Sequence, residues 1–401
     1  MADTINVALI GQGFMGRSHS NAWGQVNRFF TPPVKAVMHT VYGTEGEDPK
    51  AFAERWGWKN ASNNWEALVK SSEIGLVDIV TPNFMHAPPA KAAVVAGKPC
   101  ACEKPVAGTL AEAREMAEAA KKAKVDTFVW FNYRRAPAVA FAHQLVKQGA
   151  LGNILHVRAT YLQDWATDAV PFAWRFQKEL AGSGAHGDLN AHIVDMTRFV
   201  TGLEVDTVCG AIAETFVKKR RIIENTTGRG ISDAEVRYAK AEAGTEKMGD
   251  VTVDDTVLFL VKYNNGAVGS YEAARQATGN QNANGWEING TKGSLKFNFE
   301  SMNTLEYYDG TRPRGVQGWT TIMCTHGGDH PYVANYWPDA HIIGYEHCFT
   351  SMAYDILLKL SGKEPTVPLP DFNDAYQTQR VLEAAMLCAT EKRWIKLDDV
   401  K

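Results

Sequence analysis

The sequence has little that would direct it to a nucleic acid or a membrane. Its formal net charge is −3, and the one basic cluster is VKKRR at 217–221, which we interpret as a solvated loop. No apolar run approaches the roughly 20 residues of a membrane span. The first residues, MADTINVALIG, lack a basic region before the apolar run, so we expect no signal peptide and a cytoplasmic protein.

The sequence also lacks the signatures of a disulfide framework or a metal centre. The six cysteines are scattered without a CxxC pair, which predicts free thiols in a cytosolic chain. The histidines that could suggest a metal are His326, His330, His341 and His347. Their spacing matches no standard zinc signature, so we expect no bound metal.

What the sequence does have is a regular alternation of strand and helix patterns over its first third. Short apolar runs at 5–11, 34–42, 75–82 and 125–133 are separated by helix-like segments. The clearest helix pattern is 109–123, where Thr and Glu have the spacing of a capping box. This alternation predicts an α/β unit, residues 1–133, with a parallel sheet.

The rest of the chain, 134–401, has a different hydrophobic pattern. Longer runs with period-two alternation predict a second α/β domain with a large, mostly antiparallel open sheet. These runs are 153–165, 205–217, 254–275 and 285–300. We interpret 218–250 as an insertion loop and 309–341 as an irregular, functional segment, followed by helices over 346–361 and 371–391.

The motif GQGFMG lies where the first strand meets the first helix. Gly11 would make the tight turn, Gly13 would let a pyrophosphate approach the backbone, and Gly16 would allow close helix–strand packing. We expect Phe14 and Met15 to contact the same cofactor. The motif favours a Rossmann dinucleotide-binding domain over a purely structural turn.

The end of the second strand says less about which dinucleotide is bound. An acidic residue that binds the NAD ribose is expected there, but the sequence reads HTVYGTEGED. Glu45 or Glu47 could substitute, and no arginine offers itself for the 2′-phosphate of NADP. The sequence favours NAD and leaves NADP open.

A second group of polar residues lies in GSGAHGDLNAHIVD, 182–195. Asp188, His192 and Asp195 have spacings that place them on one helix face, where a carboxylate could orient an imidazole for proton transfer. The alternatives are a helix cap at Asp188 and a hydrogen-bonded interior histidine at 192. The segment alone does not decide between these interpretations.

Several further candidates follow the ends of predicted strands, where α/β proteins keep their chemistry. Those that could line a cofactor crevice are Thr81, Asn83, His86, Glu103, Lys104 and Asn132. The segment 163–176 mixes polar and aromatic groups suited to a sugar, namely Gln163, Trp165 and Arg175. Ordinary turns and core aromatics would look much the same.

Taken in order, these motifs resemble the Gfo/Idh/MocA oxidoreductases. The matching segments are GQGFMGRSHS, VDIVTPNFMH, AGKPCACEKP, FNYRRAP, and WRF followed by GSGAHGDLNAHIVD. The later HIIGYEHCF, 341–349, is similar to the larger sugar-dehydrogenase branch that includes levoglucosan dehydrogenase-like enzymes. Where the family has GDIGSH this sequence has GDLNAH, so Asn190 replaces a glycine.

The resemblance implies a catalytic set of Lys104, Asp188 and His192. It also implies that Glu103 and Arg175 contact NAD, that His341 and Tyr345 contact substrate with the residues named above, and that the open sheet forms a homodimer or homotetramer. The expected reaction is oxidation of a secondary hydroxyl of a sugar, polyol or glycoside, with either His192 or Lys104 as base. Two alternatives remain, a glycosidase acting through transient oxidation and a non-catalytic dinucleotide-responsive regulator.

Overall fold

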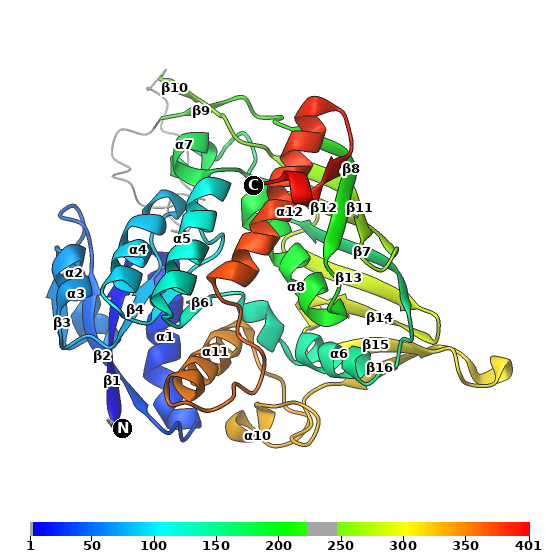
Figure 1. Ribbon diagram of the computed structural model, residues 1–401, viewed down its shortest axis with the longest axis horizontal. Coiled ribbons are helices and arrows are strands. Elements are labelled where there is room, and N and C mark those ends of the chain that lie inside the picture. Colours follow the sequence, from blue (N-terminus) through cyan, green and yellow to red (C-terminus); the bar gives the residue numbers. More distant parts are fainter. Residues whose placement is uncertain (1–2, 223–246) are drawn as a thin grey trace.

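The computed structural model describes residues 3–222 and 247–401, which form two main sheets (Figure 1). The N-terminal sheet has six strands in the order β3-β2-β1-β4-β5-β6, and every neighbouring pair is parallel. The strands are Thr4–Ile10 (β1), Lys35–Tyr42 (β2), Asn60–Ser62 (β3), Leu76–Ile79 (β4), Cys100–Cys102 (β5) and Thr127–Val129 (β6). The predicted Rossmann-type parallel sheet is confirmed.

Helices follow these strands as the sequence predicts, with α3 and β3 as additions. They are Phe14–Phe29 (α1), Pro49–Trp56 (α2), Trp65–Lys70 (α3), Ala87–Val95 (α4), Leu110–Ala123 (α5) and Pro137–Lys147 (α6). Thr109 and Glu112 form the predicted capping box of α5. Short turns of helix are Asn83–Met85 (η1) and Asn132–Arg135 (η2), at the carboxyl ends of β4 and β6.

The second sheet has nine strands in the order β16-β15-β14-β13-β7-β12-β11-β8-β17. Its pairs are antiparallel except β7 with β12, so the predicted mostly antiparallel sheet is confirmed. The strands are Ile154–Leu162 (β7), Val205–Glu214 (β8), Thr256–Tyr263 (β11), Val268–Ala274 (β12), Ala283–Gly290 (β13), Gly293–Asn298 (β14), Thr304–Asp309 (β15), Trp319–Met323 (β16) and Ile395–Lys396 (β17). Lys219–Arg221 (β9) pairs separately with Met248–Asp250 (β10).

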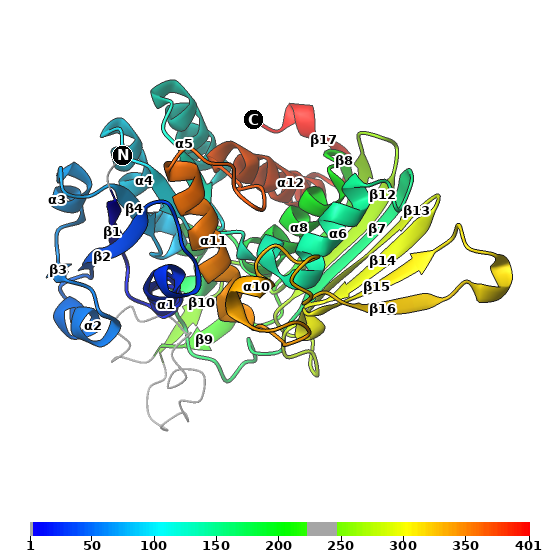
Figure 2. The ribbon, with the colours of Figure 1, turned by 90° about the horizontal axis from the view of Figure 1, so that it is seen from below.

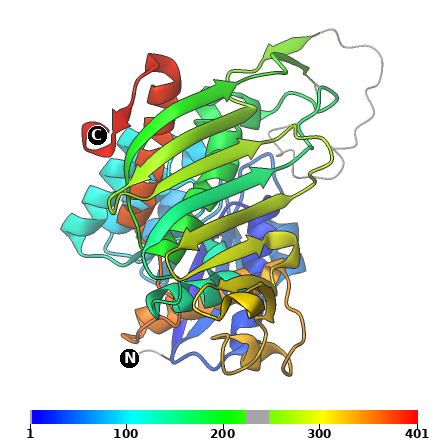
Figure 3. The same cartoon turned by 90° about the vertical axis from the view of Figure 1, so that its right-hand side faces the viewer.

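The nine-stranded sheet packs helices against one face and leaves the other open. Figure 3 shows the open face turned to the viewer, with the helices behind it. Alternate side chains account for the difference, since Val257, Phe259 and Val261 on β11 are buried while Leu260 is 49% exposed. Two further apolar side chains, Ile212 and Val268, are exposed on neighbouring strands of the open face.

The last two long helices return to the N-terminal sheet. Tyr345–Leu360 (α11) packs against α1, and Phe372–Glu391 (α12) packs against α5 and against Ala191–Thr201 (α8) (Figure 2). The remaining helical segments are Trp174–Phe176 (η3), Lys178–Ala181 (α7), His186–Asn190 (η4, a π-helical turn), Phe299–Ser301 (η5), Arg314–Val316 (η6), Val333–Tyr336 (α10) and Leu397–Asp399 (η7). Helices from the end of the chain thus join the two sheets.

Two sequence expectations need correction. The segment 309–341 is not irregular throughout, because β16 pairs with β15 and extends the sheet by one strand. The expected insertion loop 218–250 begins and ends in the paired strands β9 and β10, and its residues 223–246 lie outside the described part of the chain. Within the described part, no helix is long and apolar enough to cross a membrane.

Candidate active site

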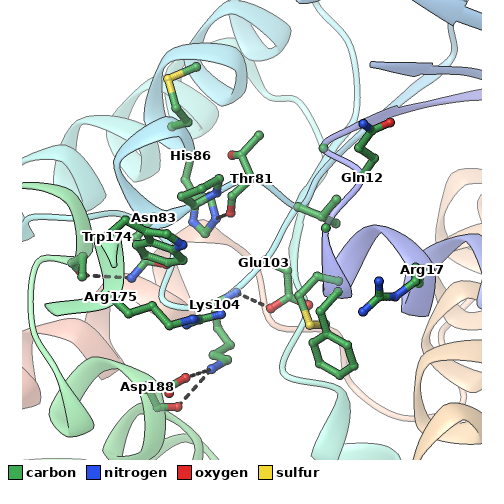
Figure 4. Close-up of a pocket in the computed structure, with 18 of the residues that line it drawn as sticks. Gln12, Arg17, Thr81, Asn83, His86, Glu103, Lys104, Trp174, Arg175 and Asp188 are labelled. Carbon is green, nitrogen blue, oxygen red and sulfur yellow. Dashed lines mark hydrogen bonds and ion pairs between the residues drawn. The ribbon is translucent and has the colours of Figure 1, made fainter. Parts of the chain in front are cut away.

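A cavity of about 1260 Å³ lies at the carboxyl ends of the parallel strands, between the N-terminal sheet and the nine-stranded sheet. Its lining contains most of the residues that the sequence analysis proposed for a site; the exceptions are Gly16, Glu45, Asp195 and His341. Figure 4 shows Lys104, Arg175 and Asp188 grouped in one part of this cavity and Gln12 and Arg17 in another. The sequence motifs therefore meet in one place.

The glycine motif forms the turn between β1 and α1. Gly11 has φ +116°, a conformation that side chains with a Cβ rarely adopt, and its N–H donates to the Tyr42 carbonyl at 3.1 Å. A Cβ on Gly16 would lie 2.8 Å from the Gly11 carbonyl oxygen, so this residue packs the helix against the turn and does not line the cavity. A Cβ on Gly13 would meet nothing within 4 Å, which leaves the backbone open to the cavity.

The residues after β2 line the same cavity, with two differences from expectation. Glu47 lines it, but its carboxylate accepts from the Thr44 N–H at 2.8 Å and hydroxyl at 3.0 Å, while Glu45 is outside the lining. The sequence offered no arginine for a 2′-phosphate, whereas Arg17 of α1 and Arg55 of α2 both line the cavity.

Glu103 belongs to a buried charge network that the sequence did not reveal. His19, on α1 and fully buried, places Nδ1 2.9 Å from Asp78 and Nε2 3.0 Å from Glu103. The other Glu103 oxygen accepts the Lys104 backbone N–H at 3.0 Å. Burial lowers the pKa of His19, but the two carboxylates outweigh it and raise that pKa to about 9.

Lys104, next in sequence, contacts Asp188 across the cavity floor. Its Nζ donates to the Asp188 carbonyl at 3.0 Å and lies 3.3 Å from Oδ1 (Figure 4). The Lys104–Pro105 peptide bond is cis. The segments that carry Lys104 and Asp188 also meet at Gly182, which has φ +78° and where a Cβ would lie 2.2 Å from the Gly108 carbonyl oxygen.

Asp188 is held in its charged form. Burial favours the neutral acid, but the positive charges around the carboxylate outweigh it and lower the pKa of Asp188 well below its ordinary value. The cations are Lys104, Arg175 and Arg275. Lys104 Nζ and Asp188 Oδ1 lie 3.3 Å apart and form an ion pair.

His192 is held in its neutral form. Burial lowers its pKa most, the charge of Lys104 lowers it further, and Asp188 offsets only part of the effect. The imidazole lies on the Tyr133 ring with centroids 4.2 Å apart, and no residue of the described part of the chain forms a hydrogen bond with its buried Nδ1. A neutral imidazole in this setting can accept a proton.

The helix-face prediction for 188, 192 and 195 is only partly right. The π-helical turn η4 precedes α8, and in the described residues Asp188 bonds to Lys104 and makes no hydrogen bond to His192. Asp195 lies outside the cavity, where it forms a buried ion pair with Arg134. The imidazole is positioned by aromatic packing instead of a carboxylate.

One wall of the cavity combines hydroxyl, amide and indole groups. Gln163 donates to Asn282 Oδ1 at 2.8 Å and accepts from the Trp165 indole N–H at 2.7 Å. Tyr161 also donates to Asn282, at 2.9 Å, and its hydroxyl lies 3.3 Å from that of Tyr133. This wall presents aromatic faces and polar edges, which suits a sugar.

Three buried amide or hydroxyl atoms of the cavity lining have no hydrogen-bond partner among the described residues. They are Gln12 Oε1, Thr81 Oγ1 and Asn132 Nδ2, all on residues that line the cavity. His86 is different, since its ring nitrogens lie 2.8 and 2.9 Å from the Pro105 and Thr81 carbonyl oxygens. Asn83 donates to the Ala181 carbonyl at 2.9 Å. The unpartnered atoms fit a polar ligand such as a dinucleotide.

The segment 341–349 divides between cavity and surface. Tyr345 lines the cavity, while His341 is exposed and its Nδ1 lies 3.0 Å from the Pro338 carbonyl oxygen. The expected substrate contact by His341 is therefore not supported by its position. In 3–222 and 247–401, no group of three His, Cys, Asp or Glu side chains is placed to hold a metal.

Sequence reasoning missed several lining or supporting residues. They are Gln12, Arg17, Arg55, Tyr133, Tyr161, Trp174, Arg275, His19 and Asn282. Tyr133 follows Asn132 in the motif FNYRRAP at the end of a strand, so this motif could have pointed to Tyr133. Gln12, Arg17 and His19 lie within GQGFMGRSHS, and Trp174 precedes Arg175 in WRF, so these motifs could have pointed to them as well. Arg55, Arg275 and Asn282 lie in segments for which the sequence carries no such signal.

Comparison with known proteins places the chain among oxidoreductases. Residues 5–131 match the family model described as "Oxidoreductase family, NAD-binding Rossmann fold", and residues 139–296 match the GFO/IDH/MocA C-terminal domain. A levoglucosan dehydrogenase from Pseudarthrobacter phenanthrenivorans is 37% identical over 399 residues, 99% of each chain.

Solved structures agree over the full length. An oxidoreductase domain protein from Kribbella flavida superposes with a TM-score of 0.89 at 42% identity, covering 99% of this chain and 100% of that one. A levoglucosan dehydrogenase in complex with NADH and levoglucosan has a TM-score of 0.87 at 36% identity, covering 98% and 99%. The similarity therefore includes both sheets.

Proposed function

Because this chain belongs to the Gfo/Idh/MocA oxidoreductase family, we propose that it is an NAD-dependent dehydrogenase that oxidises a secondary hydroxyl of a sugar, cyclic polyol or glycoside. The observation that carries the proposal is the ion pair of Lys104 with Asp188 beside the neutral His192, at the carboxyl end of a Rossmann sheet. The levoglucosan dehydrogenase relative makes anhydrosugars the first substrates to test.

The residues around the glycine turn fit a dinucleotide. The Gly11–Gly13 backbone and the N-terminus of α1 would hold the pyrophosphate, and the unpartnered Thr81 and Asn132 groups would meet other polar parts of NAD. We assign contacts along this path to Phe14, Met15, Asn83, His86, Glu103 and Arg175 as well. NAD supplies the hydride acceptor when bound.

The chain's own groups account for substrate orientation and proton transfer. Lys104, fixed by Asp188, would donate a hydrogen bond to the reacting hydroxyl oxygen and stabilise negative charge there. His192 would take the hydroxyl proton, since its lowered pKa keeps it neutral. The wall containing Gln163, Trp165 and Tyr345 would orient the ring.

Variants of the two central residues test these roles. Lys104→Met and His192→Gln should each lower turnover by at least about a hundredfold, the usual size of a general acid–base contribution. Binding of NADH, followed by its fluorescence, should persist in both. The control is Lys98→Met, a lysine that lies outside the cavity. Full turnover by both variants would exclude the mechanism.

The substrate itself requires a screen. Wild-type protein is incubated with anhydrosugars, polyols and glycosides in the presence of NAD or NADP, and NADH and released aglycone are measured together. Accumulation of NADH supports the dehydrogenase. Aglycone release without net NADH would identify the redox-neutral glycosidase instead, and comparison of NAD with NADP tests whether Arg17 and Arg55 admit a 2′-phosphate.

We also propose that two copies associate through the open face of the nine-stranded sheet, as a dimer or as part of a tetramer. Ile212, Leu260 and Val268 are 54%, 49% and 45% exposed on adjacent strands, a costly arrangement for an isolated monomer. Leu260→Glu should dissociate the assembly in light scattering. Val95→Glu, at an 84% exposed position on α4, is the control and should leave its mass unchanged.

Two further proposals concern the division of the chain into domains and its location in the cell. We divide the chain into a cofactor domain, 1–133, and a substrate-binding domain, 134–401. The six cysteines are free thiols, as is common in reducing compartments, and this supports a cytoplasmic location.

A further inference from the structure

The sugar-facing wall of the cavity depends on a loop with little regular structure of its own. Residues 163–176 bring Gln163, Trp165, Trp174 and Arg175 to the cavity, and their one helical segment is the single turn η3. A loop of this kind needs support from elsewhere to hold several side chains in fixed positions.

Arg220, on β9, supplies much of that support from outside the cavity. Its guanidinium donates to three carbonyl groups of the loop, with Nη2–O 2.7 Å to Ala166 and Nη1–O 3.0 Å to Val170, and with Nη1 also bonded to Thr167. It lies 3.9 Å from the centre of the Phe176 ring. Arg220 is fully buried and does not line the cavity.

The rest of the β9–β10 pair continues this contact along the loop. The Phe172 N–H donates to the Arg221 carbonyl at 2.8 Å, and the Thr252 N–H donates to the Phe176 carbonyl at 3.0 Å. Gly249 on β10 faces the Phe172 ring so closely that a Cβ would lie 2.6 Å from it. The loop therefore lies directly on the two strands.

A second arginine links this support to the cavity. Arg275 lines the cavity and packs on Phe176 and Trp165, with distances of 5.4 and 5.5 Å to the ring centres. Phe176 thus contacts Arg220 and Arg275 together. A shift of Arg220 would therefore also displace the Trp165 indole. Because this indole donates a hydrogen bond to Gln163, Gln163 would move as well, although Arg220 itself does not contact substrate.

We propose that Arg220 is a positioning residue for sugar specificity, and that the β9–β10 pair sets the shape of the sugar-binding wall. The proposal rests on the dehydrogenase function proposed above. A buried cation held by backbone carbonyls is expensive, and burial lowers the pKa of Arg220 to about 10. Lysine cannot replace it, because its compact ammonium lacks the planar fork that reaches several carbonyls and stacks on a ring.

The test compares Arg220→Lys and Arg220→Met with Lys219→Met, a neighbouring residue on β9 whose side chain is 65% exposed. With the best sugar from the screen, both Arg220 variants should raise KM by between about ten- and a hundredfold, the cost of a misplaced contact residue. They should also change the ratio of kcat/KM between two sugars. NADH affinity should stay at the wild-type value, and Lys219→Met should match wild type throughout.

Hydrogen exchange measured by mass spectrometry gives a readout that does not depend on activity. Amides of 163–176 should exchange faster in Arg220→Met, while those of 100–108 keep their protection. Unchanged KM, sugar ratio and loop protection in a folded Arg220→Met protein would overturn the inference. The inference would also be overturned if both Arg220 variants lost NADH affinity and melting temperature to the same extent, because this would show that Arg220 has a general structural role.

The two proposals fail in different ways. If wild-type protein oxidises no sugar, the dehydrogenase function is wrong and the specificity role of Arg220 falls with it. If wild type is active and the Arg220 variants keep its sugar preference, only the role of Arg220 is wrong.

Discussion

Replacing His19 by glutamine should destabilise the protein strongly near neutral pH and much less at alkaline pH. Asp78 accepts N–H groups from Trp23 at 2.7 Å and Trp130 at 2.8 Å, so both of its oxygens already face donors. Glu103 accepts the Lys104 N–H in the same way. Each ring nitrogen of His19 therefore faces a carboxylate oxygen, and an imidazolium satisfies both.

The size of the effect follows from the pKa of His19. Its value rises from 6.5 in the unfolded chain to about 9 in the folded protein, which corresponds to about 3 kcal/mol of stability. Because the folded pKa is the higher one, this stability is fully present below pH 6.5 and is lost as pH rises to about 9. Glutamine does not titrate, so the His19→Gln protein lacks this pH-dependent contribution to stability.

The assay is urea-induced unfolding of wild type and His19→Gln at about pH 6 and about pH 10. The difference in free energy of unfolding between the two proteins should shrink by about 3 kcal/mol from the lower to the higher pH. Only a residual difference due to packing should remain. Groups that titrate in both proteins cancel in the comparison. His143→Gln is the control, because burial lowers the pKa of that half-buried histidine and its effect should change little above pH 6.5.

A difference between wild type and His19→Gln that is equal at both pH values would refute the reasoning. It would mean that His19 is neutral in the folded protein and that one of the two carboxylates holds a proton. Direct titration of the His19 ring by NMR would then show no proton loss near pH 9.

Three further predictions concern the site and its supports. Lys104→Met should raise the pKa of His192 toward 6.5, because a nearby positive charge is removed; NMR titration checks this, and a further fall in the pKa would contradict it. Gly182→Ala should lower both melting temperature and turnover, because its Cβ would meet a carbonyl oxygen 2.2 Å away; unchanged values would exclude this constraint. Arg134→Met should cost about 3–5 kcal/mol in urea unfolding, because it leaves the buried Asp195 carboxylate without its ion-pair partner, and a neutral effect would show that Asp195 takes up a proton.

The sequence was sufficient where the fold is built from local signals. The glycine turn, the capping box at Thr109 and the apolar runs of the parallel strands each depend on neighbouring residues, and all were predicted correctly. The pairing of Lys104 with Asp188 could be anticipated only from the order of family motifs, since 84 residues separate them. Physical patterns along one chain do not encode that distance.

Other parts of the site could not be predicted because tertiary packing decides them. His19 looks like any polar residue inside a helix, and its role depends on strand ends 59 and 84 residues away. The spacing of 188, 192 and 195 assumed a regular α-helix, but the π-helical turn η4 changes which groups meet. His341 was assigned by similarity of its segment, although the loop directs it to the surface.

The proposed chemistry requires two sheets to stay aligned, because Lys104 belongs to one and His192 to the helix that covers the other. Buried ion pairs cross this boundary, since Arg134 after β6 bonds both to Asp195 of α8 and to Asp374 of α12. Ion pairs fix direction as well as distance, whereas apolar contacts alone would tolerate sliding of the helices. The ion pairs of Arg134 therefore fix the N-terminal sheet, which carries Lys104, relative to the helix α8, which carries His192.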